Sequence, residues 1–237
     1  GAHTYPPEYK NDHKQYLDLI IKELLPYNIK NKLSDSVDAF CEKSAFSSEE
    51  VDKIFSKAKK LGYKLRLHTE QFNNIGGLKV ALKHKALSVD HLEVMNEDDI
   101  PKLAKSETVG VLLPGVSFFL DYDYAPARKL IEHNAIIALA TDYNPGSSHI
   151  PNLHFIMQLA ALKMKMSAEE IISAVTINSA AALGLNEKLG SIEIGKQADF
   201  AAFDTKDYQE IIYNIGINLN KYTIKKGQII FERAETL

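Results

Sequence analysis

Short apolar segments alternate with amphipathic segments over the first 142 residues of the chain. Nearly continuous apolar runs predict strands that are covered on both faces, as in parallel sheets, and apolar residues three or four positions apart predict helices between them. The predicted strands are 37–42, 64–68, 86–91, 109–114 and 136–141. The predicted helices are 14–25, 47–61, 77–83, one that begins at 96, and 127–133.

Local signals set the ends of several of these elements. The run Ser47-Ser48-Glu49-Glu50 has the spacing of a capping box. Pro26 follows the first helix and is expected to end it. Gly1-Ala2-His3 is typical of the end of a further strand. The alternation predicts an α/β fold of the TIM-like (β/α)8 type, incomplete at its N-terminus because too few strands are present to close a barrel.

The pattern changes after residue 142. Two long helices are predicted at 152–165 and 168–183, and short strands are predicted within 190–204 and 222–231. The pair Lys226-Gly227 indicates a hairpin turn. We therefore divide the chain into barrel residues 1–185 and residues 186–237, which form part of a small β-sandwich domain.

Composition excludes several classes of protein. Hydrophobic residues make up 45% of the 237 residues and charged residues 25%, as in ordinary globular proteins. The net charge is −3 and no basic patch is visible, so nucleic acid is not expected as a partner. No apolar run approaches the roughly 20 residues of a membrane span. The single cysteine, Cys41, excludes a disulfide framework, and we expect a cytoplasmic protein in which Cys41 is a buried small residue.

Three of the predicted strands end in a residue that can bind a metal or move a proton. These residues are His68, His91 and Asp142. Each alone is commonly structural, the histidines as packed strand ends and the aspartate as a turn or cap residue. Because catalytic groups of α/β barrels gather at the carboxyl ends of the strands, the three together favour a metal-dependent hydrolase.

Several motifs of the chain resemble those of a known family. Ala140-Thr141-Asp142 with His68 and His91, together with GSIEIGKQADF at 190–200, is similar to the amidohydrolase superfamily. Within it, the chain resembles the imidazolonepropionase family over essentially its whole length. The segments that carry this likeness are GAHTYPPEY at 1–9, LLPGVSF at 112–118 with YAPAR at 124–128, and DYNPGS at 142–147.

The resemblance implies an activity and a set of site residues. The activity is hydrolysis of the cyclic amide C–N bond of 4-imidazolone-5-propanoate to N-formimidoyl-L-glutamate, in histidine degradation. His68 and Asp142 would bind one divalent metal ion, zinc or iron. Asp142 would act as general base and then general acid, and His91 would hydrogen-bond the nucleophile or the developing oxyanion. The residues that the resemblance assigns to substrate binding are His3, Gln71, Asn144 and Gly146.

The sequence also departs from the family. Gln71 stands where some members carry a glutamate, and an amide cannot transfer protons. No His-x-His motif occurs in the chain, although the superfamily uses one from its first strand as metal ligands. We therefore expect a chain without the N-terminal part of the enzyme. The alternatives are another cyclic amidohydrolase, an aminohydrolase (deaminase), or a non-catalytic fragment. The family further suggests a homodimer.

Overall fold

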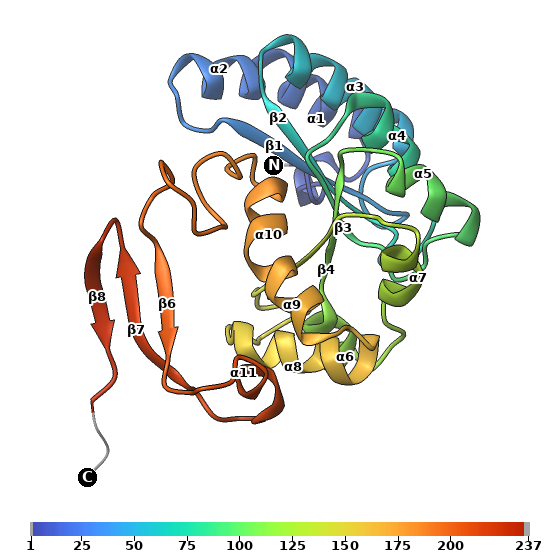
Figure 1. The fold of residues 1–237 in the computed structure, drawn as a ribbon. Coiled ribbons are helices and arrows are strands. Elements are labelled where there is room, and N and C mark those ends of the chain that lie inside the picture. Colours follow the sequence, from blue (N-terminus) through green and yellow to red (C-terminus); the bar gives the residue numbers. More distant parts are fainter. Residues whose placement is uncertain (1, 235–237) are drawn as a thin grey trace. The chain divides into compact units, whose positions relative to one another are not determined.

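Four parallel strands form the sheet of the first of two units into which the chain divides. The computed structural model describes residues 2–234; unit 1 comprises residues 1–112 and 129–136, and unit 2 comprises residues 113–128 and 137–237. The four strands lie side by side in sequence order (Figure 1). They are β1 (Ser36–Cys41), β2 (Lys64–Thr69), β3 (Ser88–His91) and β4 (Val109–Leu112). Each prediction for them is confirmed to within two residues at either end.

The register of this sheet decides which side chains become neighbours. Phe40 of β1 lies opposite His68 of β2, and His68 lies opposite Asp90 of β3. Ala2 pairs with Ala39 in an isolated parallel bridge, and its carbonyl accepts a hydrogen bond from the backbone nitrogen of Phe40 at 2.9 Å. The prediction that a further strand ends here is thus supported at Ala2, while Gly1 lies outside the described residues.

Helices cover one face of β1 and β2. The helices packed there are α3 (Ser48–Lys60) and α4 (Gly77–His84). Ser47 and Glu50 form the predicted capping box at the start of α3. A Cβ atom on Gly77 would lie 2.0 Å from Oγ1 of Thr69, so the glycine lets α4 begin directly against the end of β2. In β2 the buried side chains on the face toward these helices alternate with half-buried polar side chains on the other face.

Pro26 does not end the first helix. The helix runs as α1 (His13–Leu19), a π-helical segment (Ile20–Leu24) and α2 (Leu25–Lys30). Pro26 falls in the first turn of α2, where its missing N–H and fixed φ are tolerated because the wider turn of the π segment precedes it. The remaining helical elements of unit 1 are the short 3-10 helices Pro7–Tyr9 and Glu97–Asp99 and the helix α5 (Ile100–Ala104). Helix α7 (Ala127–Glu132) includes residues of both units.

Unit 2 contains the fifth predicted strand and most of the later helices. These elements are α6 (Pro114–Leu120), β5 (Ile137–Leu139), α8 (Leu153–Met164), α9 (Ala168–Val175), α10 (Ile177–Ala182) and α11 (Glu210–Tyr213). The helix predicted over 168–183 is divided at Thr176, whose φ of −119° and ψ of −95° are not helical. Its hydroxyl donates to the carbonyl of Ile172 at 2.6 Å, a side-chain bond that competes with the helical ladder.

A separate antiparallel sheet follows in unit 2. Its strands are β6 (Phe200–Phe203), β7 (Asn220–Lys225) and β8 (Gln228–Glu232), in that order (Figure 1). The predicted hairpin turn is confirmed, since Lys226 and Gly227 both have positive φ, at 51° and 78°. The strand predicted over 190–204 is wrong for 190–199, where Gly190 and Gly195 have positive φ and the chain forms turns instead. No described helix is long and apolar enough to cross a membrane.

Candidate active site

His68 lies at the carboxyl end of β2 with its ring between side chains of the two neighbouring strands. Its Nδ1 atom is 3.0 Å from Oδ2 and 3.1 Å from Oδ1 of Asp38 on β1. The same Nδ1 atom is 3.4 Å from Oδ2 of Asp90 on β3. The register of the sheet explains this arrangement. Asp90 lies directly opposite His68, and Asp38 lies two residues before Phe40, the β1 residue opposite His68.

Two further histidines surround His68. The ring of His3 is 4.8 Å from that of His68, centroid to centroid, and His3 Nε2 is 3.3 Å from Oδ2 of Asp38. The ring of His91 lies 5.5 Å from that of His68, and its Nδ1 atom is 3.4 Å from Oε2 of the buried Glu93. Three sequence-predicted residues of unit 1, at positions 3, 68 and 91, are therefore brought together.

The two aspartates beside His68 have opposite pKa shifts. Burial would raise the pKa of Asp38, but hydrogen bonds from His3 and His68 and their charges outweigh it, and the pKa lies below its ordinary value. Burial raises the pKa of Asp90 to about 6, and the charge of His68 offsets only part of that effect. A carboxylate that stays ionised and one that holds a proton more readily thus flank the same imidazole.

Gln71 is buried just beyond β2, in a segment held by one carboxylate. Oε1 of Glu42 accepts hydrogen bonds from the backbone nitrogens of Gln71 at 3.0 Å, Phe72 at 3.0 Å and Asn73 at 3.2 Å. Glu42 is 1% exposed. The carboxylate therefore fixes the path of the chain directly after Glu70, where φ is +58° and the strand turns away from the sheet.

The predicted residues of unit 2 lie together in one loop after β5. The side-chain oxygen of Asn144 accepts from the backbone nitrogens of Gly146 and Ser147, both at 2.8 Å. Its side-chain nitrogen donates to the backbone oxygen of Asp142 at 2.7 Å and to Oδ2 of Asp142 at 3.2 Å. Asn144 thus organises the loop that presents Asp142, in addition to any contact with substrate.

Left-handed backbone marks the ends of these strands. Asp142 has a φ of +46° and His91 has a φ of +85°. Such values are uncommon for residues other than glycine and cluster at functional sites, where surrounding contacts hold them. Asp142, predicted to transfer protons, and His91, predicted to bind the oxyanion, therefore both have this uncommon backbone conformation.

Asp38 was not predicted from the sequence as a residue of the cluster around His68. His3, Asp38 and His68 each offer a ligand atom within 4.8 Å of the others, and they are the group of metal-binding side chains found among the described residues. The available signal was a charged residue in a strand whose other positions are mostly apolar. Asp90 was visible only as the neighbour of His91.

The chain matches a known family model over most of its length. The matching model is that of the amidohydrolase family, over residues 18–230. The chain belongs to the amidohydrolase family. The predicted fold class, strands and helices of a hydrolase barrel with part of a small β domain, is confirmed for this amidohydrolase by the family match and by the two sheets.

Several curated relatives of this amidohydrolase chain are named imidazolonepropionase. The protein from Christiangramia forsetii is 50% identical over 84% of this chain and 49% of its own length. Those from Flavobacterium johnsoniae and Streptococcus pyogenes are 46% and 42% identical over 97% and 100% of this chain, and over 56% of their own lengths in both cases. The chain therefore spans about half the length of the curated relatives it matches.

Solved structures share the fold of this amidohydrolase at low sequence identity. An adenosine deaminase from Xanthomonas campestris with bound zinc superposes with a TM-score of 0.76 at 19% identity, over 97% of this chain and 59% of its own. An atrazine chlorohydrolase from Arthrobacter aurescens complexed with zinc has a TM-score of 0.72 at 18% identity, over 90% and 56%. These likenesses support the fold alone.

Proposed function

We propose that this chain carries part of the active site of an imidazolonepropionase. The reaction is hydrolysis of the cyclic amide C–N bond of 4-imidazolone-5-propanoate to N-formimidoyl-L-glutamate. The observation that carries the proposal is the identity of 42–50% to curated relatives with that name, over 84% or more of this chain. The gathering of His3, His68 and His91 at strand ends supports it, because these residue types suit a hydrolytic site.

The proposed metal ligands are His68 and Asp142. His68 fits this role because a carboxylate contacts its Nδ1 atom, the arrangement that orients ligand histidines in metalloproteins. Imidazole and carboxylate donors suit zinc and iron alike, so the proposal is one divalent ion of either element. When bound, the ion supplies a water of lowered pKa and polarises the ring carbonyl.

The remaining steps fall to side chains of this chain. Asp142 accepts a proton from the attacking water and returns it to the departing ring nitrogen. His91 donates a hydrogen bond to the carbonyl oxygen of the substrate as negative charge develops there. His3, Gln71, Asn144 and Gly146 bind the substrate in this proposal, and Asn144 also holds the loop of Asp142.

The proposal is tested by measuring turnover and metal content together. The purified protein is assayed with 4-imidazolone-5-propanoate, with cytosine and guanine as deaminase controls, while metal content is determined by mass spectrometry. In a protein that includes the His-x-His segment, we expect formation of N-formimidoylglutamate and its loss in His68→Ala and Asp142→Asn. This chain has no His-x-His motif and is expected to be inactive by itself. The matched control is His133→Ala, because His133 is an exposed histidine at the end of a helix. Release of ammonia from cytosine or guanine would instead identify a deaminase.

The oligomeric state, the localisation, the partners and the domain division are further parts of the proposal. We propose a homodimer in the cytoplasm that acts on a small molecule and not on nucleic acid. The division into a barrel at 1–185 and a β domain at 186–237 also stays a prediction; the strands β6, β7 and β8 fall within the second range. Light scattering of the purified protein tests the oligomeric state directly.

A further inference from the structure

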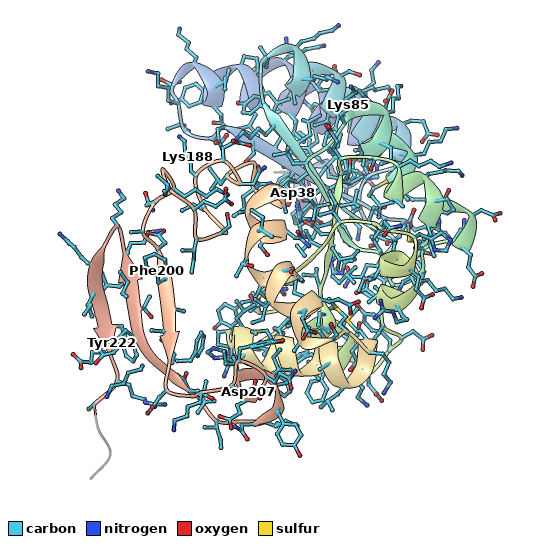
Figure 2. All side chains as sticks on the ribbon, viewed as in Figure 1. Asp38, Lys85, Lys188, Phe200, Asp207 and Tyr222 are labelled. Atoms are coloured by element: carbon cyan, nitrogen blue, oxygen red, sulfur yellow. The ribbon has the colours of Figure 1, made fainter. Side chains whose placement is uncertain are left out.

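One carboxylate of unit 1 contacts two imidazole rings at once. Asp38, labelled in Figure 2, lies on β1 and reaches His3 through its Oδ2 atom at 3.3 Å. It reaches Nδ1 of His68 through Oδ2 at 3.0 Å and Oδ1 at 3.1 Å. In the group formed by His3, Asp38 and His68, the carboxylate of Asp38 contacts both imidazole rings.

We propose that Asp38 is a positioning residue that sets the tautomers of His3 and His68 in opposite senses. The inference rests on the proposed metal role of His68. A neutral imidazole carries one N–H, and an ionised carboxylate can only accept hydrogen bonds. The ring nitrogen that faces Asp38 is therefore the protonated one in each histidine. That nitrogen is Nδ1 in His68 and Nε2 in His3.

The consequence for His68 is that Nε2 carries the lone pair. This is the atom that a divalent ion requires, and the carboxylate behind the ring also raises its basicity. The consequence for His3 is the reverse, since Nδ1 becomes the acceptor. We infer that His3 recognises an N–H group of the substrate ring and not a carbonyl oxygen. Asp38 thus links the metal ligand to a substrate-binding residue through a single side chain.

Asp38 and not Asp90 is assigned this role on geometry. Asp90 lies 3.4 Å from Nδ1 of His68, which is longer than either contact from Asp38. Asp38 is also the carboxylate that reaches His3. Asp90 is therefore a secondary contact of one ring, whereas Asp38 is shared by two.

The test is nuclear magnetic resonance of nitrogen-labelled histidine in the metal-free protein, without substrate. At about pH 8, above the ordinary pKa of imidazole, two-bond nitrogen–proton correlations report which ring nitrogen bears the proton. We expect Nδ1–H for His68 and Nε2–H for His3 in the unaltered protein. The opposite tautomer on either ring would overturn the proposal. Because this measurement is made on the unaltered protein, it does not depend on the folding of a variant.

Asp38→Leu provides the second arm. Leucine has no acceptor atom, so neither ring nitrogen that faces residue 38 keeps its hydrogen-bond acceptor there. We expect at least one of the two histidines to change tautomer. Unchanged spectra for both would show that Asp38 does not set them. The matched control is Asp52→Leu, because Asp52 of α3 contacts Nε2 of His84 of α4 at 2.6 Å, and only the signals of His84 are expected to change.

Metal binding gives an independent readout. Loss of a carboxylate behind a ligand histidine typically weakens metal binding about 10- to 100-fold. We expect a weakening of that size for Asp38→Leu in competition with a chromophoric chelator, and none for Asp52→Leu. Equal zinc affinity of Asp38→Leu and the unaltered protein would contradict the link to the metal. Because neither experiment uses the proposed substrate, failure of the proposed reaction is distinguishable from failure of this inference.

Discussion

The side-chain nitrogen of Asn144 donates to both the backbone oxygen and the carboxylate of Asp142, at 2.7 and 3.2 Å. The oxygen of the same amide accepts from two backbone nitrogens two and three residues further on. One side chain therefore closes the loop and holds the carboxylate that we propose as a metal ligand and proton carrier. Asp142 has a φ of +46°, a conformation that such contacts stabilise.

Replacement of Asn144 by alanine is expected to reduce turnover. Alanine removes all of these bonds, and misplacement of a reacting group by about 1 Å can cost roughly 100-fold in rate. We expect kcat/KM for 4-imidazolone-5-propanoate to fall by about that factor, with most of the loss in kcat. Steady-state kinetics provide the measurement. Asn31→Ala serves as control, since Asn31 donates to Tyr27 on an exposed helix end, and a similar loss in that variant would contradict the explanation.

Glu42 is expected to contribute to stability through the segment at 71–73. Glu42→Ala leaves three backbone N–H groups without their acceptor, and an unsatisfied buried polar group costs about 1–3 kcal/mol. We expect the free energy of unfolding in urea to fall by about 3 kcal/mol or more. Glu42→Gln retains an acceptor oxygen and should lose less. The exposed Glu107→Ala should change stability by less than about 0.5 kcal/mol, and an equal effect of the two alanine variants would refute the assignment.

Cys41 is expected to be unreactive in the folded protein. Burial, followed by the charge of Glu42, raises the pKa of its thiol to about 12, and the residue is fully buried. Since the thiolate is the reacting species, a disulfide reagent at about pH 8 should not label the native chain. The same reagent in urea should label one thiol per chain, because the sequence contains a single cysteine. Rapid labelling without denaturant would show that the thiol is accessible.

Asp199 is expected to make the stability of the antiparallel sheet depend on acid. Hydrogen bonds from Lys225 and then from the backbone of Lys226 lower the pKa of Asp199 to about 2. A carboxyl group whose pKa is lower in the folded than in the unfolded state stabilises the fold above its unfolded pKa. This contribution is lost as pH falls from about 4 to about 2. Asp199→Asn removes it at every pH.

The measurement is the difference in melting temperature between the unaltered protein and Asp199→Asn as a function of pH. We expect that difference to shrink over this range and to be smallest near pH 2. Lys225→Met should behave like Asp199→Asn, because it removes the strongest of the bonds to the carboxylate. A difference that does not vary with pH would show that Asp199 does not titrate with a lowered pKa.

The strand ends could be predicted from the sequence because each is a local event. An apolar run that stops at His68 or Asp142 needs only adjacent residues to be recognised, and parallel strands present such ends at one edge. The strand predicted at 190–199 failed for a local reason as well. Gly190 and Gly195 adopt positive φ, and Nζ of Lys196 donates a hydrogen bond to Oγ of Ser191 at 2.5 Å. Alternating apolar residues do not reveal that preference.

The sequence by itself determined the strands of the first 142 residues, the capping box at Ser47, the hairpin at 226–227 and the residues that end the strands, since these depend on neighbours a few positions apart. Only the tertiary structure decided the partners of those residues. Asp38 meets His68 across 30 positions and His3 across 35 because the register of β1 with β2, and the bridge at Ala2, bring three distant segments together. A hydrogen bond between distant segments depends on this pairing, and no local pattern in the chain encodes it.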